Sequence, residues 1–176
     1  MGKAWLVRTL RRAVTAVFLV GLQTAPSLAA CVLRIDPADS ERKILECGDD
    51  LIVRAARDTT FHEIIAPGEP NPTAIALQKG AVSVQFRAGA SRNGFEVRTP
   101  RAIAAVRGTR WVVEADAVRT SVFVLSGEVS VTESKLGRTV MLGRGQGVDI
   151  TDEADSGASQ AWPQERVREL LSRVGE

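Results

Sequence analysis

The chain has few of the side chains on which most catalytic sites depend. It contains no tyrosine, two cysteines and a single histidine, His62. A tetrahedral zinc shell needs four ligands, and these three residues do not complete one. No serine lies in the Gly-x-Ser-x-Gly pattern of a nucleophile elbow. We therefore expect no catalytic residue, no metal and no cofactor. A hydrolase that acts through carboxylates alone stays open as the alternative.

The chain also lacks an apolar run long enough to cross a membrane. A transmembrane helix needs about 20 apolar residues, and the apolar stretch at residues 13–22 is far shorter. Basic residues precede this stretch and small residues follow it, which is the order of a secretory signal peptide. These flanking residues are Lys3, Arg8, Arg11 and Arg12 before it, and Ser27, Leu28 and Ala29 after it. We predict a signal peptide over residues 1–29, and a periplasmic or secreted mature protein with no transmembrane segment.

Net positive charge disappears with this signal peptide. The whole chain has a formal net charge of +2, and residues 1–29 contribute four cations and no acid, so the remainder carries −2. A nucleic-acid-binding domain needs a basic face. We therefore expect no nucleic-acid partner, and attraction to anionic membrane surfaces loses its main basis.

The two cysteines, Cys31 and Cys47, favour a disulfide. Each borders a short strand-like run, and the polar turn at residues 36–41 separates the runs, so a hairpin would place the cysteines opposite each other. An exported chain permits oxidation, and closing such a loop stabilises the fold by about 3 kcal/mol. The alternative is a lipoprotein, because residues 28–31 also match a lipobox ending at Cys31. Lipidation would leave Cys47 as a free thiol.

The remaining sequence predicts an all-β domain over residues 30–151. Short Val- and Ile-rich runs, broken by Gly, Pro, Asn or Asp, are typical of strands. We expect strands at 51–53, 61–65, 74–77, 81–86, 95–98, 111–114, 121–125, 129–131, 139–142 and 148–150. Residues 80–84 and 94–97 are echoed in order by residues 127–131 and 147–150. This repetition favours a rolled, solenoid-like or sandwich-like architecture, although Gly-x-Val-x-Val is also a common turn-then-strand pattern.

The C-terminal tail differs from the β domain in composition. Residues 152–161 are acidic and rich in small residues, which predicts a linker. Residues 162–176 predict a helix that begins near Pro163, with Trp162 as its anchor. Its apolar side chains recur at helical spacing: Val167, Leu170, Leu171 and Val174. We expect this stripe to dock on the β domain, with a partner-binding role as the alternative.

Residues 99–150 carry a succession of short motifs. They are Thr99-Pro100 before a small-residue strand, Val106-Arg107-Gly108-Thr109 with Trp111, Val124-Leu125-Ser126-Gly127 before Val129 and Val131, and Leu142 with Gly145-Gln146-Gly147-Val148. In order and spacing this segment resembles the FecR domain, an all-β periplasmic module of bacterial envelope signalling. The resemblance names a module and not a reaction.

Two of these motifs have a structural and a functional interpretation. Closely spaced glycines in residues 143–147 could approach a phosphate, but a strand follows them instead of a helix, so we expect turn glycines with positive φ. For Arg107-Gly108-Thr109 we favour a tight bend at Gly108, with Arg107 paired to an acid such as Glu114 or Glu128 and to backbone carbonyls. The alternative makes Arg107 an exposed recognition residue.

The resemblance implies a non-catalytic protein that binds an envelope protein or a surface polymer, and we expect it to be a monomer. Signalling proteins of this family place an anti-sigma domain in the cytoplasm and cross the membrane once. Because no cytoplasmic domain precedes the predicted signal peptide, we expect only the periplasmic module to carry over.

Overall fold

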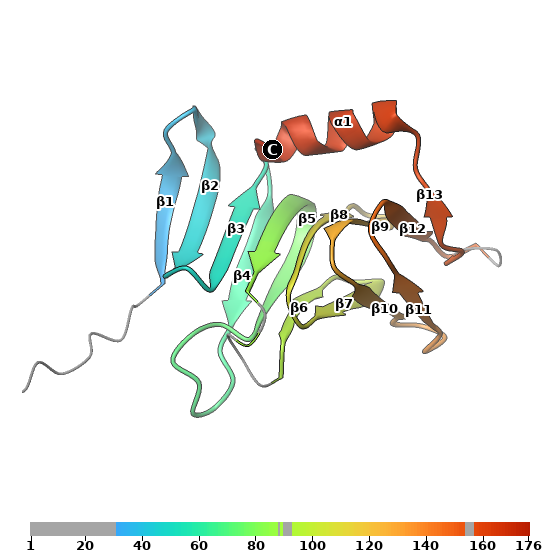
Figure 1. Ribbon diagram of the computed structural model, residues 1–176, viewed down its shortest axis with the longest axis horizontal. Coiled ribbons are helices and arrows are strands. Elements are labelled where there is room, and N and C mark those ends of the chain that lie inside the picture. The colour runs from blue at the N-terminus through green and yellow to red at the C-terminus, as the bar shows by residue number, and fades with distance from the viewer. Residues whose placement is uncertain (1–30, 88, 90–92, 154–156) are drawn as a thin grey trace, which may run out of the picture.

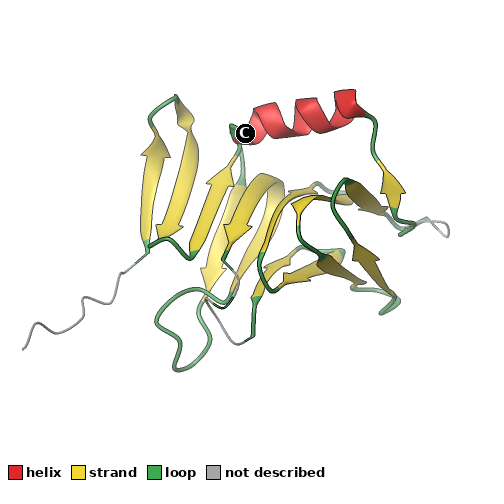
Figure 2. Cartoon of the chain, in the orientation of Figure 1, coloured by secondary structure: helices red, strands yellow, loops and turns green. Residues whose placement is uncertain are grey.

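The chain folds into one curled β-sheet with a helix laid across it (Figure 1, Figure 2). The computed structural model describes residues 31–87, 89, 93–153 and 157–176, so the predicted signal peptide lies outside the described residues. The strands are β1 (Val32–Asp36), β2 (Asp39–Cys47), β3 (Leu51–Ala55), β4 (Thr60–Ile64), β5 (Ala74–Phe86), β6 (Phe95–Arg98), β7 (Ala102–Val106), β8 (Thr109–Ala115), β9 (Thr120–Ser126), β10 (Val129–Glu133), β11 (Thr139–Leu142), β12 (Gln146–Ile150) and β13 (Gln160–Ala161). The helix is α1 (Gln164–Val174). The predicted all-β fold with one short C-terminal helix is confirmed.

Strand β5 joins the two halves of the sheet. Its first residues pair with β4 and, in parallel, with β6, whereas from Gly80 onward it pairs with β3 and β8. The helix-covered half contains β1, β2, β3, the end of β5, β8, β9, β12 and β13, and the open half contains β4, the start of β5, β6, β7, β10 and β11. The sequence predicted two strands where the structure has the single strand β5, because a glycine such as Gly80 often interrupts a strand. It bends the strand instead, with a φ of +97°.

The core lies between the inner faces of the two halves. Strand β8 shows how the alternation of the sequence produces it: Trp111 and Val113 point inward and are fully buried, and Glu114 lies on the other face. Phe95 from the open half meets the edge of Trp111 at a centroid distance of 6.3 Å and stacks on Phe86 at 5.6 Å. These aromatic rings fasten the two halves together.

A disulfide closes the N-terminal hairpin as predicted. Cys31 and Cys47 are bonded, and the register that pairs Val32 with Glu46 places them directly opposite each other.

Helix α1 packs on the outer face of the helix-covered half, as its apolar stripe predicted. Trp162, Leu170 and Val174 form a second buried cluster with Ala56, Ala81, Val112 and Phe123 of the sheet, and Val167 and Leu171 pack against it. The segment predicted as a linker contains β13, which pairs with β12. No helix among the described residues has the length and hydropathy of a membrane span.

The two echoed segments lie in opposite halves of the sheet. Residues 80–84 belong to β5 in the helix-covered half, and residues 127–131 lead into β10 in the open half. Each begins with a glycine of positive φ, Gly80 at +97° and Gly127 at +83°. The first of these glycines bends the continuous strand β5, and the second lies in the turn before β10.

Candidate functional site

Three turns that carry the sequence motifs meet at one end of the sheet. Strand β7 ends at Val106 opposite the first residue of β10, Val129, which in turn lies opposite Leu142 at the end of β11. The turns β7–β8, β9–β10 and β11–β12 therefore lie at the same end, which we call the turn end. It contains Arg107, Gly108, Gly127 and residues 143–145.

The β7–β8 and β9–β10 turns touch each other. The Thr109 hydroxyl donates a hydrogen bond of 3.0 Å to the carbonyl of Glu128. A side chain at Gly127 would place its Cβ 2.8 Å from the Gly108 carbonyl oxygen and 2.8 Å from Thr109 Oγ1. Gly108 itself has a φ of +137°, in the region that favours glycine. The motif residues Gly108, Thr109 and Gly127 thus act together to hold two turns in contact.

Arg107 lies at the surface of the turn end, and the ion pair expected for it is not there. Its side chain is exposed and pairs with no acid among the described residues. Glu114, one of its two expected partners, instead bonds to Arg173 of α1 at 2.7 Å. Glu128, the other, is exposed. The predicted pairing was wrong, because Glu114 lies near the far end of β8, five residues beyond Thr109, or about 17 Å along an extended strand.

Trp111 is a core residue. Its side chain is fully buried against Phe95, and its indole Nε1 has no hydrogen-bond partner among the described atoms. It supports the turn end from beneath, since β8 begins only two residues earlier at Thr109.

The glycines of the β11–β12 turn serve two different purposes. Gly145 has the positive φ expected for a turn, +80°, and its N–H donates to the carbonyl of Val124 at 2.8 Å. The Gly143 N–H donates to Oε1 of Gln146 at 2.8 Å, which closes the turn. Gly147 does not have a positive φ. It makes room for Trp162, whose Cε2 would lie 2.4 Å from a Cβ at position 147.

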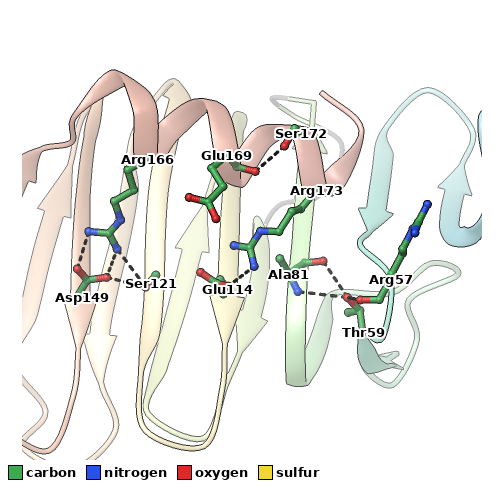
Figure 3. A network of polar contacts seen from close by, with 10 residues as sticks. All are labelled: Arg57, Thr59, Ala81, Glu114, Ser121, Asp149, Arg166, Glu169, Ser172 and Arg173. Carbon is green, nitrogen blue, oxygen red and sulfur yellow. Dashed lines mark hydrogen bonds and ion pairs between the residues drawn. The ribbon is translucent and has the colours of Figure 1, made fainter.

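A polar network lies under the helix next to this contact (Figure 3). Arg166 reaches from α1 to both oxygens of Asp149 on β12, at 2.9 and 2.6 Å, and the hydroxyl of Ser121 on β9 donates to Asp149 at 2.6 Å. Burial acts to raise the pKa of Asp149, but the bonds from Arg166 and Ser121 together lower it below its ordinary value. The Arg166 guanidinium also lies 3.5 Å from the centre of the Trp162 ring.

The second half of the helix is held in the same way. Arg173 bonds to Glu114 on β8, which raises the pKa of Arg173. The Ser83 hydroxyl on β5 donates to Glu176 at 2.8 Å. Together these contacts join α1 to β5, β8, β9 and β12, so the helix is fixed along its length.

The described histidine is exposed, and several of the described acids are paired with arginines. His62 lies exposed on β4, whereas Asp149 is engaged by Arg166, Asp152 by Arg101 at 2.8 Å, and Glu133 by Arg138 at 3.0 Å. The hydrogen bond from Arg101 lowers the pKa of Asp152, the direction of a paired anion and not of a general acid. No described group of three or more His, Cys, Asp or Glu residues could hold a metal ion.

One shallow cavity opens at the turn end. It has a volume of about 350 Å³ and is lined by Gln85, Phe86, Gly108, Thr109, Arg110 and Ser126. The lining includes Phe86 of the aromatic core and the turn-end residues Gly108 and Thr109. Such a lining can contact a partner's side chain and supplies no nucleophile with an adjacent base.

Comparison with known proteins finds a matching family model and similar solved structures. The family model described as FecR protein matches residues 34–130, more than half of the chain. Two crystal structures of a candidate anti-sigma factor from Parabacteroides distasonis ATCC 8503, at 2.50 and 1.65 Å resolution, share the fold. Each has a TM-score of 0.54 and 16% identity, over 81% of this chain and 61% of that chain. No curated protein matches the sequence.

Proposed function

This chain belongs to the FecR protein family, and from that membership we propose that it is a non-catalytic binding module of bacterial envelope signalling. The two similar structures support the proposed signalling role, since both are of a candidate anti-sigma factor. The chain spans only 61% of their length. Regulation of a sigma factor is therefore a property of the neighbours, and the present proposal is limited to binding an envelope protein or a surface polymer.

Location outside the cytoplasm is part of this proposal. The Cys31–Cys47 disulfide needs an oxidising compartment, in agreement with the signal peptide predicted from the sequence. Because Cys31 is bonded to Cys47, the periplasmic or secreted form is favoured over a lipoprotein.

The exposed Arg107 carries the proposal. A guanidinium that served the fold would be paired with an acid or a carbonyl, as those of Arg166 and Arg173 are. Arg107 sits instead at the surface, on a turn whose shape Gly108 and Gly127 fix. A rigid turn that presents an unpaired cation is suited to recognise a carboxylate on a partner. The turn end is therefore the proposed binding surface.

The test compares partner capture with stability. Protein purified from the periplasm is immobilised as wild type, Arg107→Ala or Arg168→Ala, and envelope proteins of the source bacterium are passed over each. Arg168 is a matched control, because it is exposed on α1 and pairs with no described acid. We expect Arg107→Ala to lose specific partners while its urea midpoint stays unchanged, and Arg168→Ala to lose neither.

Two outcomes would contradict the proposal. If Arg107→Ala captures the same proteins as wild type, the turn end is not the binding surface. If Arg107→Ala instead lowers the free energy of unfolding in urea by about 1–3 kcal/mol, which is the cost of leaving a buried polar group without its partner, Arg107 stabilises the fold.

A further inference from the structure

Strand β1 is an apolar strand at an open edge of the sheet. Among the described residues it pairs only with β2. Val32, Leu33 and Ile35 are 56%, 54% and 54% exposed. In Figure 1 the β1–β2 hairpin stands at the left of the molecule, with β1 as its outermost strand. Proteins normally protect such an edge with charges, proline or a covering segment, because its free N–H and C=O groups are a template for another strand.

The other edge strands are shorter or more polar. Strand β13 has two residues, Gln160 and Ala161, and β4 carries His62 and Glu63 at its surface. Strand β11 has four residues and one exposed large apolar side chain, Met141. The concentration of three exposed apolar side chains on β1 therefore sets this edge apart within the described part of the sheet.

Both ends of β1 are fixed. The disulfide holds Cys31 to Cys47 at one end. At the other end the Asp36 carboxylate accepts the N–H of Ala38 at 2.9 Å and lies 3.2 Å from Nε of Arg42. A strand held at both ends loses little conformational freedom when another chain pairs with it, which favours binding.

From these observations we infer that β1 is a docking strand, to which an extended apolar segment of a partner protein adds as a further strand of the sheet. The main-chain groups of an edge are matched along their length only by another extended polypeptide. Side chains set the chemistry of the partner. Leu33 and Ile35 would meet apolar residues at alternate positions, and the exposed cation Lys43, which lies opposite Ile35, would attract an acidic residue. Arg34 is already paired with Glu46 of β2.

A second copy of this chain fits the edge less well. An antiparallel pair of β1 strands centred on the middle residue would set Arg34 opposite Arg34 of the other copy, and because each Arg34 is already paired with its own Glu46, the contact would add no new ion pair. The edge is also only five residues long, and a stable dimer buries at least about 1,200 Å². A short edge of this kind suits a transient partner segment.

This inference does not depend on the turn end, and its test uses a different probe. Protein purified from the periplasm is titrated into a short fluorescent peptide of alternating valine with threonine and glutamate, and anisotropy gives the dissociation constant. A twin peptide, methylated on alternate backbone nitrogens, keeps the side chains and loses the hydrogen bonds. Leu33→Lys places a charge on the edge strand. Val118→Lys is its control, because Val118 is 67% exposed in the β8–β9 turn.

We expect the peptide to bind wild type and Val118→Lys equally, and the methylated twin and Leu33→Lys each to weaken binding by about tenfold or more. Weaker binding of a peptide that lacks these backbone hydrogen bonds distinguishes strand addition from binding through side chains alone. Equal binding of the twin peptide, equal loss in Val118→Lys, or no binding at millimolar protein would overturn the inference. So would β1-dependent doubling of the mass in solution, or β1-dependent sedimentation with phosphatidylglycerol vesicles, which would identify a second copy or a lipid surface as the occupant.

Discussion

A single methyl group at position 147 tests whether the β11–β12 turn and helix α1 form one structural unit. In Gly147→Ala the new Cβ would lie 2.4 Å from Cε2 and 2.6 Å from Nε1 of Trp162. Carbon atoms in favourable contact are about 3.5–4.0 Å apart. The indole ring would therefore have to move by about 1 Å. It has little space to do so, because it is 7% exposed and stacks on Phe123 at a centroid distance of 5.3 Å.

The size of the effect follows from the contacts that Trp162 would lose. The stack on Phe123 stabilises the fold by about 0.5–1.5 kcal/mol, and the contact with the Arg166 guanidinium by about 0.5–2 kcal/mol. Replacing glycine by alanine restricts the unfolded chain and returns about 0.4–1 kcal/mol. We expect Gly147→Ala to lower the free energy of unfolding by about 0.5–2.5 kcal/mol, below the roughly 3–5 kcal/mol of a buried Trp→Ala change.

Urea denaturation of a double-mutant cycle measures this coupling. Gly147→Ala should cost much less in a Trp162→Ala background, because the residue it displaces is already gone. Gly143→Ala is the matched control from the same turn: its Cβ would meet only Oε1 of Gln146, at an ordinary 3.5 Å. The reasoning is refuted if Gly147→Ala costs no more than Gly143→Ala, or if its cost is the same with and without the Trp162 side chain.

Three further predictions concern charge, covalent closure and backbone shape. The pKa of Asp149 is lowered in the folded protein, so its stabilisation is present above its unfolded pKa of about 4 and is lost as the pH falls below that value. Asp149→Asn should therefore reduce the loss of unfolding free energy on acidification, measured by urea denaturation at several pH values. An unchanged pH dependence would argue against this role. Replacing both Cys31 and Cys47 by serine should cost about 3 kcal/mol in urea unfolding; free thiols in the mass of the wild-type protein would exclude the bond. Gly108→Val should lower the melting temperature through a strain of about 1–3 kcal/mol, and an equal melting temperature would contradict the positive φ.

Features set by neighbouring residues could be predicted from the sequence. The disulfide hairpin follows from two strand-like runs around one polar turn, and α1 follows from an apolar stripe of helical period. Strand β8 follows from alternation, with Trp111 and Val113 on one face. In each case a regular pattern along the chain, which is a hairpin, a helical period or an alternation, determines which residues face each other.

Features set by contacts between distant residues could not be predicted. Gly147 is a glycine because Trp162, fifteen residues later, packs against it, and sequence alone classed it as a turn residue. Arg107 does not meet its expected acid, because Glu114 lies near the far end of β8, where Arg173 of the helix binds it. Which of several arginines reaches a given acid depends on the fold, so the chemical pattern of charges does not determine the pairing.

The two faces of the sheet explain why α1 belongs to the folded module. On the open half, outward-facing polar side chains pair with each other: Arg98 bonds to Glu96 at 2.9 Å, and the hydroxyls of Thr132 and Thr139 lie 3.0 Å apart. On the helix-covered half, the outward-facing Val112 and Phe123 are apolar and buried. An antiparallel sheet normally places polar residues on a face that meets water. Strands β8 and β9 thus carry apolar side chains outward because the C-terminal helix covers them, and a partner could take the place of α1 only by breaking the pairs that Arg166 and Arg173 make with the sheet.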